Sequence, residues 1–140
     1  MDHPHPRPRR RGNAHDQRGQ ALSAFVAVVL SALFGVAGLV VDGGAKSAAK
    51  AEAESVAAHA ARAAVDASAR ARATGTPLDV GAVIRAGSDV IADRGITGQV
   101  TITDGVVRVT TTTSTRTVFL SLIGITSLTA SGEATASLQR

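Results

Sequence analysis

The three residue types of a hydrolytic triad occur close together in this chain, at Ser55, His59 and Asp66. Such a triad works only when an acid orients the histidine and oxyanion donors line a pocket beside the serine. The spacing places all three side chains near one face of a single alanine-rich helix, and a straight helix supplies no such pocket. We therefore expect no catalytic residues, and we expect that the protein is not an enzyme.

Metal and cofactor chemistry has no recognisable pattern either. The sequence has no cysteine, and His3, His5 and His15 lie in a segment rich in proline and arginine. A segment with so few apolar residues cannot bury enough surface to offset the entropy of ordering, so these histidines are interpreted as solvated tail residues. Glycine motifs for phosphate or dinucleotide binding do not occur. The sequence predicts no metal site, no cofactor and no small-molecule substrate.

The feature that constrains function most is a charge-free run of 23 residues, Gly19 to Val41, between Arg18 and Asp42. As a helix it would be about 35 Å long, enough to cross a hydrocarbon core of about 30 Å. Five arginines and two aspartates lie in residues 1–18, and an arginine-rich end stays in the cytoplasm. We predict one pass through the cell membrane, with a cytoplasmic N-terminus, an extracytoplasmic C-terminal domain and Asp42 as a boundary residue.

A cleaved signal peptide is the alternative interpretation of this run. The run is longer than the apolar region of most signal peptides, and no clean small-x-small site precedes Asp42. A retained anchor in the lipid bilayer is therefore favoured.

The charge balance argues against a nucleic-acid partner. Residues 42–140 carry ten Lys and Arg against nine Asp and Glu, so the high pI comes mainly from the N-terminal tail. Nucleic-acid binding requires a basic surface on a folded module or a long basic arm. We expect no nucleic-acid partner.

Patterning divides the chain into a disordered basic tail (1–18), a transmembrane helix (19–41), an alanine-rich extracytoplasmic helix (42–74) and a small domain (75–140). Gly43-Gly44 suggests a flex point, because each glycine costs about 1 kcal/mol in a helix relative to alanine. Small apolar residues then recur at alternating spacings of four and three, which indicates a seam for close packing. The seam consists of Ala49, Ala53, Val56, Ala60, Ala63 and Ala67. Its partner is either the chain's own domain or another subunit, including a second copy.

The small domain is expected to contain one helix and an antiparallel sheet. Thr76-Pro77 is typical of a helix start and predicts a helix at about 77–94. A turn at Asp104-Gly105 then pairs Val100 with Val109 and Ile102 with Val107, which brings all four side chains to one face. Residues 117–125 suit either a buried strand or a short helix, and 128–138 alternate as a strand with small inner residues. The fold class is thus α+β and membrane-anchored.

The same order of elements occurs in type IV pilin-like proteins, and some residues carry a closer resemblance. Arg18–Phe25 resembles the Arg-Gly start of the TadE/TadG-like proteins of the tight-adherence (Flp) pilus system, and Gly38–Gly44 resembles the TadG-type exit from the membrane. Ala48–Ala67 is similar to the alanine-rich helix of that family. The closing residues 124–127 and 130–136 resemble its C-terminal strand.

This resemblance implies a pilin-like structural protein whose partners are other pilin-like or Tad membrane subunits. It also implies a candidate processing site between Gly19 and Gln20, where the fifth residue of a mature pilin is a glutamate. Ala24 stands at that position, so the resemblance points to an accessory pseudopilin-like component of a pilus or related secretion apparatus.

Two further expectations concern partners. The small residues Ala27, Ser31 and Gly35 form a ridge in the span on which another transmembrane helix can pack. The alternative function, unrelated to pili, is a membrane-anchored binding module of the cell envelope that presents its threonine-rich sheet face to an outside ligand.

Overall fold

The structure, a computed structural model, describes residues 14–138, and the chain divides into two compact units, Met1–Ala37 and Gly38–Arg140. Helix α1 (Ala14–Ala73) begins in the first unit and ends in the second. The predicted disordered tail falls largely on residues 1–13, which lie outside the described residues. The rest of that predicted tail, residues 14–18, is not disordered in the structure but belongs to helix α1.

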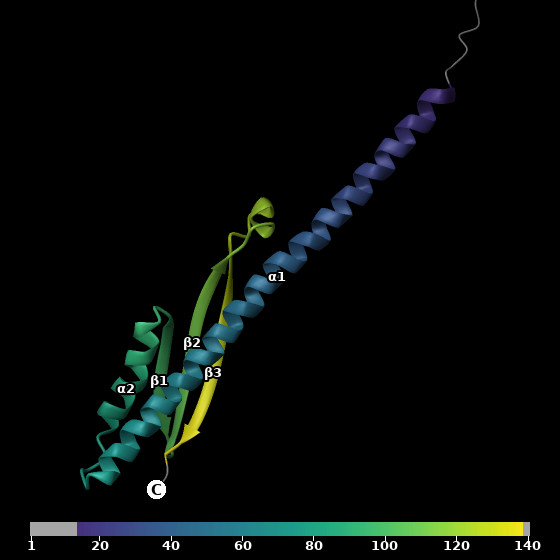
Figure 1. Ribbon diagram of the computed structural model, residues 1–140. Coiled ribbons are helices and arrows are strands. Elements are labelled where there is room, and N and C mark those ends of the chain that lie inside the picture. Colours follow the sequence, from purple (N-terminus) through teal and green to yellow (C-terminus); the bar gives the residue numbers. More distant parts are fainter. Residues whose placement is uncertain (1–13, 139–140) are drawn as a thin grey trace, which may run out of the picture. The chain divides into compact units, whose positions relative to one another are not determined.

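The second unit is a layer of helix on a layer of sheet, which confirms the α+β expectation (Figure 1). Strands β1 (Thr97–Thr103), β2 (Val106–Arg116) and β3 (Ser127–Ser137) form an antiparallel sheet in the order β1-β2-β3. The C-terminal part of α1 and helix α2 (Val80–Asp93) cover one face of this sheet. The side chains of the opposite face are exposed to solvent.

Helix α1 runs through Gly43-Gly44 without interruption, so the flex point suggested by the sequence is not seen. The cost of two helical glycines is about 2 kcal/mol relative to alanine. Residues on both sides of the pair pack against the rest of the unit, since Asp42 and Ala49 are both buried. The predicted span and the predicted alanine-rich helix are therefore one helix of 60 residues.

Helix α2 begins later than predicted, at Val80 rather than near residue 77. Its N-cap is Asp79, whose carboxylate accepts the N–H of Gly81 at 2.8 Å. The N–H of Ala82 and that of Gly81, together with Arg85, hold the pKa of Asp79 below its ordinary value. Thr76, expected as the cap, instead donates its N–H to the carbonyl of Ala71 and helps to close the end of α1.

The β1–β2 hairpin has the predicted register. Val100 lies opposite Val109 and Ile102 opposite Val107. Both turn residues, Asp104 and Gly105, have positive φ angles of 51° and 76°, as a tight type I′ turn requires. The burial pattern confirms that the four apolar side chains share the face that packs on the helices.

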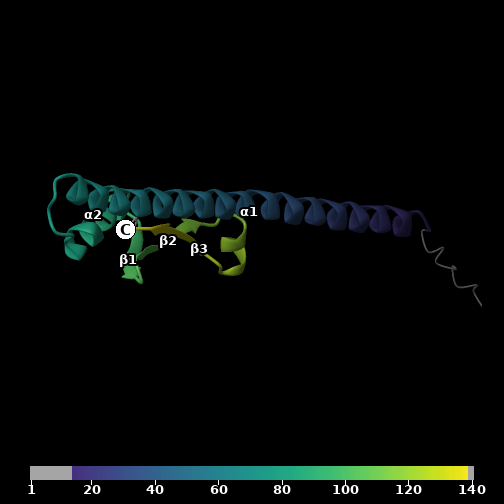
Figure 2. The same cartoon turned by 90° about the horizontal axis from the view of Figure 1, so that it is seen from below.

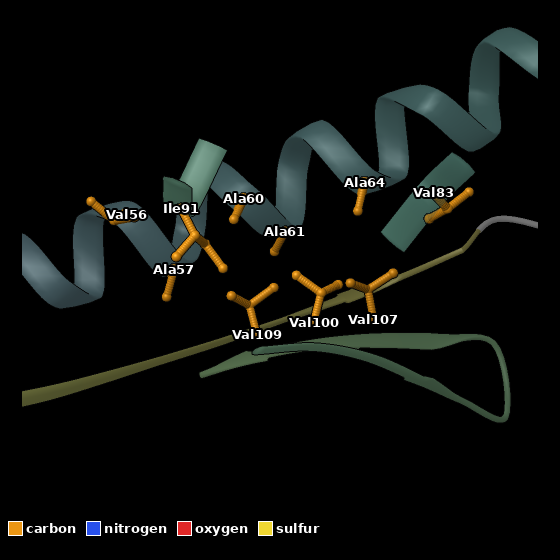
Figure 3. Close-up of a cluster of buried hydrophobic side chains, with 10 residues drawn as sticks. All are labelled: Val56, Ala57, Ala60, Ala61, Ala64, Val83, Ile91, Val100, Val107 and Val109. Carbon is orange, nitrogen blue, oxygen red and sulfur yellow. The ribbon is translucent and has the colours of Figure 1, made fainter. Parts of the chain in front are cut away.

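The core lies between α1, α2 and the sheet, and it is built from small side chains (Figure 3). Its members are Val56, Ala57, Ala60, Ala61, Ala64, Val83, Ile91, Val100, Val107 and Val109. Such short side chains allow the backbones to come close together. The closest approach is at Gly132 in β3, where an added Cβ would lie 2.4 Å from the carbonyl carbon of Ala53. The prediction of a strand with a small inner face is confirmed, and α1 is the element that packs on that face.

The sequence of residues 117–125 suits either a buried strand or a short helix, and the structure shows the short 3₁₀ helix η1 (Leu120–Ile123) there. This segment joins β2 to β3 and lies at one end of the sheet, alongside α1 (Figure 2). It is not buried as a core strand would be. Four of its apolar side chains, those of Val118, Leu122, Ile123 and Ile125, are exposed.

Candidate functional site

The alanine seam of α1 packs on the sheet of its own unit. Four of the six predicted seam residues are buried, while Ala63 and Ala67 are half-buried. The buried face also includes residues that the four-three spacing omits: Ala57, Ala61, Ala64 and Ser68. A straight α-helix has 3.6 residues per turn, so a buried stripe drifts around it relative to a strict 3.5-residue repeat. The seam is occupied by the chain itself and is not a free subunit interface.

The ridge predicted in the span is exposed along its whole length. Ala27, Ser31 and Gly35 are exposed, and an added Cβ on Gly35 would meet nothing within 4 Å. The hydroxyl of Ser31 donates to the carbonyl of Ala27 at 2.8 Å, so its polar group is already satisfied within the helix. The candidate processing residues Gly19 and Gln20 are exposed as well.

The residues with triad chemistry are dispersed on the solvent side of α1. Ser55, His59 and Asp66 are all exposed. Within the described part of the chain, no group of three or more His, Cys, Asp or Glu residues could hold a metal ion.

Asp42 is the most distinctive polar residue of the unit. Its side chain is 2% exposed, yet its carboxylate accepts three backbone N–H groups from a segment nearly eighty positions away. One oxygen, Oδ1, accepts from Val118 at 2.8 Å; the other, Oδ2, accepts from Phe119 at 3.1 Å and from Leu120 at 2.7 Å. These N–H groups open η1 and have no partner within that helix. We call this set of three hydrogen bonds the Asp42 latch.

The latch accounts for the protonation state of the carboxyl. The N–H groups of Val118 and Leu120, followed by that of Phe119, hold the pKa of Asp42 below its ordinary value of 3.8, against the opposing effect of burial. The carboxyl is therefore a charged acceptor at neutral pH. From the sequence Asp42 was interpreted as a boundary residue, and no local signal pairs it with residues 118–120.

A second contact fixes the same segment to α1. Gly38 is buried, and an added Cβ on it would lie 2.7 Å from the Cβ of Phe119. The Phe119 ring thus packs directly on the helix backbone, one turn before Asp42. Only glycine at residue 38 permits this approach.

Residues 118–125, which we call the apolar tip, are held by these contacts. Val118 is 62% exposed, Leu122 82% and Ile123 72%. No charged residue lies between Arg116 and Glu133. The tip is therefore an apolar, uncharged surface that is tied to the C-terminal end of the apolar run of α1.

The backbone of the apolar tip is largely satisfied within the segment. Leu122 donates to the carbonyl of Phe119 at 3.1 Å, Gly124 to that of Ser121 at 3.1 Å, and Ile125 to that of Leu120 at 3.0 Å. The Ser121 hydroxyl donates to the carbonyl of Val118, and that of Thr117 donates to the carbonyl of Ile125. The tip thus presents mainly side-chain carbon to its surroundings.

The exposed face of the sheet offers a different kind of surface. It is rich in hydroxyl groups, and Arg108 forms an ion pair with Glu133 on it. A shallow hollow of about 350 Å³ lies at the end of β1. Its lining is Gly95, Ile96, Thr97, Thr112, Thr113, Ser114 and Thr129, with no acid or base among them.

No protein-family model, no curated protein and no solved structure matches this chain.

Proposed function

We propose that this chain is a membrane-anchored structural protein, an accessory pseudopilin-like component of a Tad/Flp-type pilus or a related secretion apparatus. One observation carries the proposal. Helix α1 is long and apolar enough to cross a membrane, with a mean hydropathy of 2.7 over its most apolar stretch, and it continues without a break into the α+β unit. A single helix that forms both the anchor and part of the domain suits a structural protein, which is held at the membrane and packs against other subunits rather than catalysing a reaction.

The exposure of the apolar run supports anchoring over a role as a core helix. Only 6% of the most apolar stretch of α1 is buried within the described residues. Large side chains such as Phe25, Leu33 and Phe34 are each at least 60% exposed. Lipid acyl chains would cover this surface, as in a single-pass anchor. The arginine-rich tail supports a cytoplasmic N-terminus and an extracytoplasmic C-terminal unit.

The surfaces left for subunit packing are the ridge of Ala27, Ser31 and Gly35 and the outer edge of β3. Small residues let transmembrane helices approach closely, and β3 is an edge strand of the described sheet. The resemblance to TadE/TadG-like proteins and the alanine at residue 24 support an accessory role rather than a shaft subunit.

Topology is tested by single-cysteine labelling, since the native sequence has no cysteine. Ser131→Cys lies on the exposed side of β3 and is expected to react with an impermeant maleimide on intact cells. Asn13→Cys in the tail is expected to react only after the cells are opened. The reverse pattern would contradict the proposed orientation, and labelling of both in soluble extracts would contradict anchoring.

Association with the apparatus is tested by crosslinking in native membranes followed by purification of the full chain. We expect Tad-type membrane subunits to copurify, and we expect Gly35→Leu to reduce their yield because it fills the ridge. Gly43→Ala is the matched control, since it changes a glycine of the same helix outside the ridge. Recovery of the chain without any pilus or secretion subunit would refute this part of the proposal.

The second candidate is the anchored envelope-binding module, which the hydroxyl-lined hollow at the end of β1 favours. Neutral hydroxyl groups suit a polar, uncharged ligand. Binding of the full chain to isolated cell-wall material, lost in Thr112→Val, would support this candidate. It would be chosen over the first if binding occurs and no secretion subunit copurifies.

A further inference from the structure

We propose that the apolar tip, residues 118–125, inserts into the membrane interface beside the point where α1 leaves the bilayer. The extracytoplasmic unit would then be attached to lipid at two points, the helix and the tip. This inference rests on the membrane anchoring proposed above and adds a second lipid contact to it.

The depth of the tip follows from its contacts with α1. Gly38 belongs to the charge-free run, and the Phe119 side chain packs directly on it. Val41, the last residue of the run, lies three residues further on, or about 4.5 Å along the helix. Phe119 is therefore held at the level of the last turn of the apolar run. Any bilayer that covers this turn also reaches the base of the tip.

The surface of the tip matches lipid in composition. Leu122 and Ile123 are among the most exposed apolar side chains of the unit, at 82% and 72%. On the neighbouring turn of α1, Leu39 and Val40 are exposed to a similar extent, at 76% and 68%. Large exposed apolar side chains gathered at one level of a molecule mark a membrane or protein contact. The absence of charge from Thr117 to Gly132 removes the cost that a charged side chain would have near hydrocarbon.

The backbone of the tip is also compatible with immersion in lipid. Polar backbone groups in lipid need partners within the protein, because hydrocarbon offers none. Leu122, Gly124 and Ile125 donate their N–H groups to carbonyls within the tip. The three N–H groups that open η1 donate to the Asp42 carboxylate instead of to water. The latch thus satisfies the tip and shields the one charge that ends the apolar run.

Lipid is favoured over a protein partner by the location of the tip. A docking site for a soluble protein would not need to sit at the last turn of an apolar run. The Asp42 latch and the Gly38 contact hold it there at two points on α1, one turn apart. A second copy of the chain remains an outcome that the experiment must separate.

The test uses the full chain in vesicles of phosphatidylcholine and phosphatidylglycerol, with single tryptophans as depth probes. The native sequence has no tryptophan, so each variant reports one position. Leu122→Trp probes the tip, Thr135→Trp probes the exposed face of β3, and Leu30→Trp probes the proposed span. Far-UV circular dichroism checks that each variant keeps its secondary structure.

We expect the emission of Leu122→Trp to be blue-shifted and quenched by lipids brominated near the headgroup. Leu30→Trp should be quenched by lipids brominated deep in the acyl chain, and Thr135→Trp by neither. In a Leu122→Asp variant, Ile123→Trp should lose its quenching, because an acid opposes insertion.

Three results would overturn the inference in distinguishable ways. Quenching of Leu30→Trp without quenching of Leu122→Trp would reject the tip and retain the anchor. Quenching of neither would reject both. A blue shift of Leu122→Trp that no brominated lipid quenches, and that grows with the protein-to-lipid ratio, would assign the tip to a contact between copies.

Discussion

Asp42 shows how one carboxylate can end the apolar run of a helix without facing solvent. Its charge is met by three N–H groups rather than by a cation, and hydrogen bonds to an ionised group are stronger than neutral ones. Such an arrangement needs no second charged residue.

The lowered pKa of Asp42 predicts a local response to acid. A carboxyl whose pKa is below 3.8 in the folded protein stabilises the fold fully above that value, and this contribution is lost as the pH falls through the folded pKa. Hydrogen exchange should show that the amides of Val118, Phe119 and Leu120 lose protection as the pH falls through the folded pKa of Asp42. The central amides of β2 should stay protected.

Asp42→Asn supplies the control for the acid response. The amide cannot carry the charge, so protection at residues 118–120 should be weaker at neutral pH and should no longer fall with acid. If acid never reduces the protection of the wild-type amides while the central amides of β2 stay protected, or if the variant behaves like the wild type, the latch does not act as the structure indicates.

Thr111 joins the sheet to α1 through one hydroxyl. It is 1% exposed, and its Oγ donates to the carbonyl of Ala53 at 2.8 Å. Thr111→Val should lower the free energy of unfolding by about 1 kcal/mol, because it removes this hydrogen bond and places a methyl group against a carbonyl. Denaturant unfolding of the full chain in detergent micelles measures the change.

Thr112→Val is the matched control for Thr111→Val. Thr112 is the next residue of β2 and is exposed on the other face of the sheet. Its substitution should change the free energy of unfolding by no more than about 0.5 kcal/mol. Equal effects of the two variants would show that the Thr111 hydrogen bond contributes no more than strand propensity.

At the scale of elements, the spacing between α1 and β3 is set by the absence of a side chain at Gly132. An added Cβ would lie 2.4 Å from two backbone atoms of the helix, the Ala53 carbonyl carbon and the Glu54 nitrogen. Backbone atoms cannot rotate away as a side chain can. The two elements would have to separate along their whole contact.

Gly132→Ala should therefore destabilise the unit by about 1–3 kcal/mol, the range typical of overpacking. Urea unfolding followed by circular dichroism measures the loss. Gly43→Ala, in the open part of α1 with no heavy atom within 4 Å, should instead be neutral or stabilising by up to about 1 kcal/mol. A stable Gly132→Ala variant would mean that the layers can move apart freely.

The elements differ in how far the sequence predicts them. The hairpin, β3 and the apolar run follow from local rules, because turn residues and alternation act between neighbours in the chain. The drift of the buried face to Ala57, Ala61 and Ala64 depends on the helical repeat and on where the sheet lies. Residues 118–120 are hydrogen-bonded to Asp42, 76 to 78 positions away, and no local pattern within 117–125 records that contact.

At the scale of the whole molecule, the candidate site is a contact between two segments that lie far apart in the sequence, and it is not a sequence motif. The sequence indicates an apolar run, a boundary acid and an uncharged nonamer, each in its own place. It does not indicate that the acid binds the nonamer. That pairing is long-range: in the folded unit the chain returns along α1 and brings residue 118 beside residue 42.

The two halves of the latch are synthesised at different times. Its partners are separated by 76 to 78 positions, so a ribosome completes α1 well before it makes residues 118–120. During synthesis the Asp42 carboxylate has no N–H groups to accept, and a bare charge resists entry into lipid. In the anchored protein that we propose, Asp42 crosses the membrane with the rest of the C-terminal unit and reaches the extracytoplasmic surface as an unpaired charge, which keeps this end of the apolar run out of the lipid. The carboxylate becomes buried and hydrogen-bonded only once residues 118–120 have been made and have packed against α1.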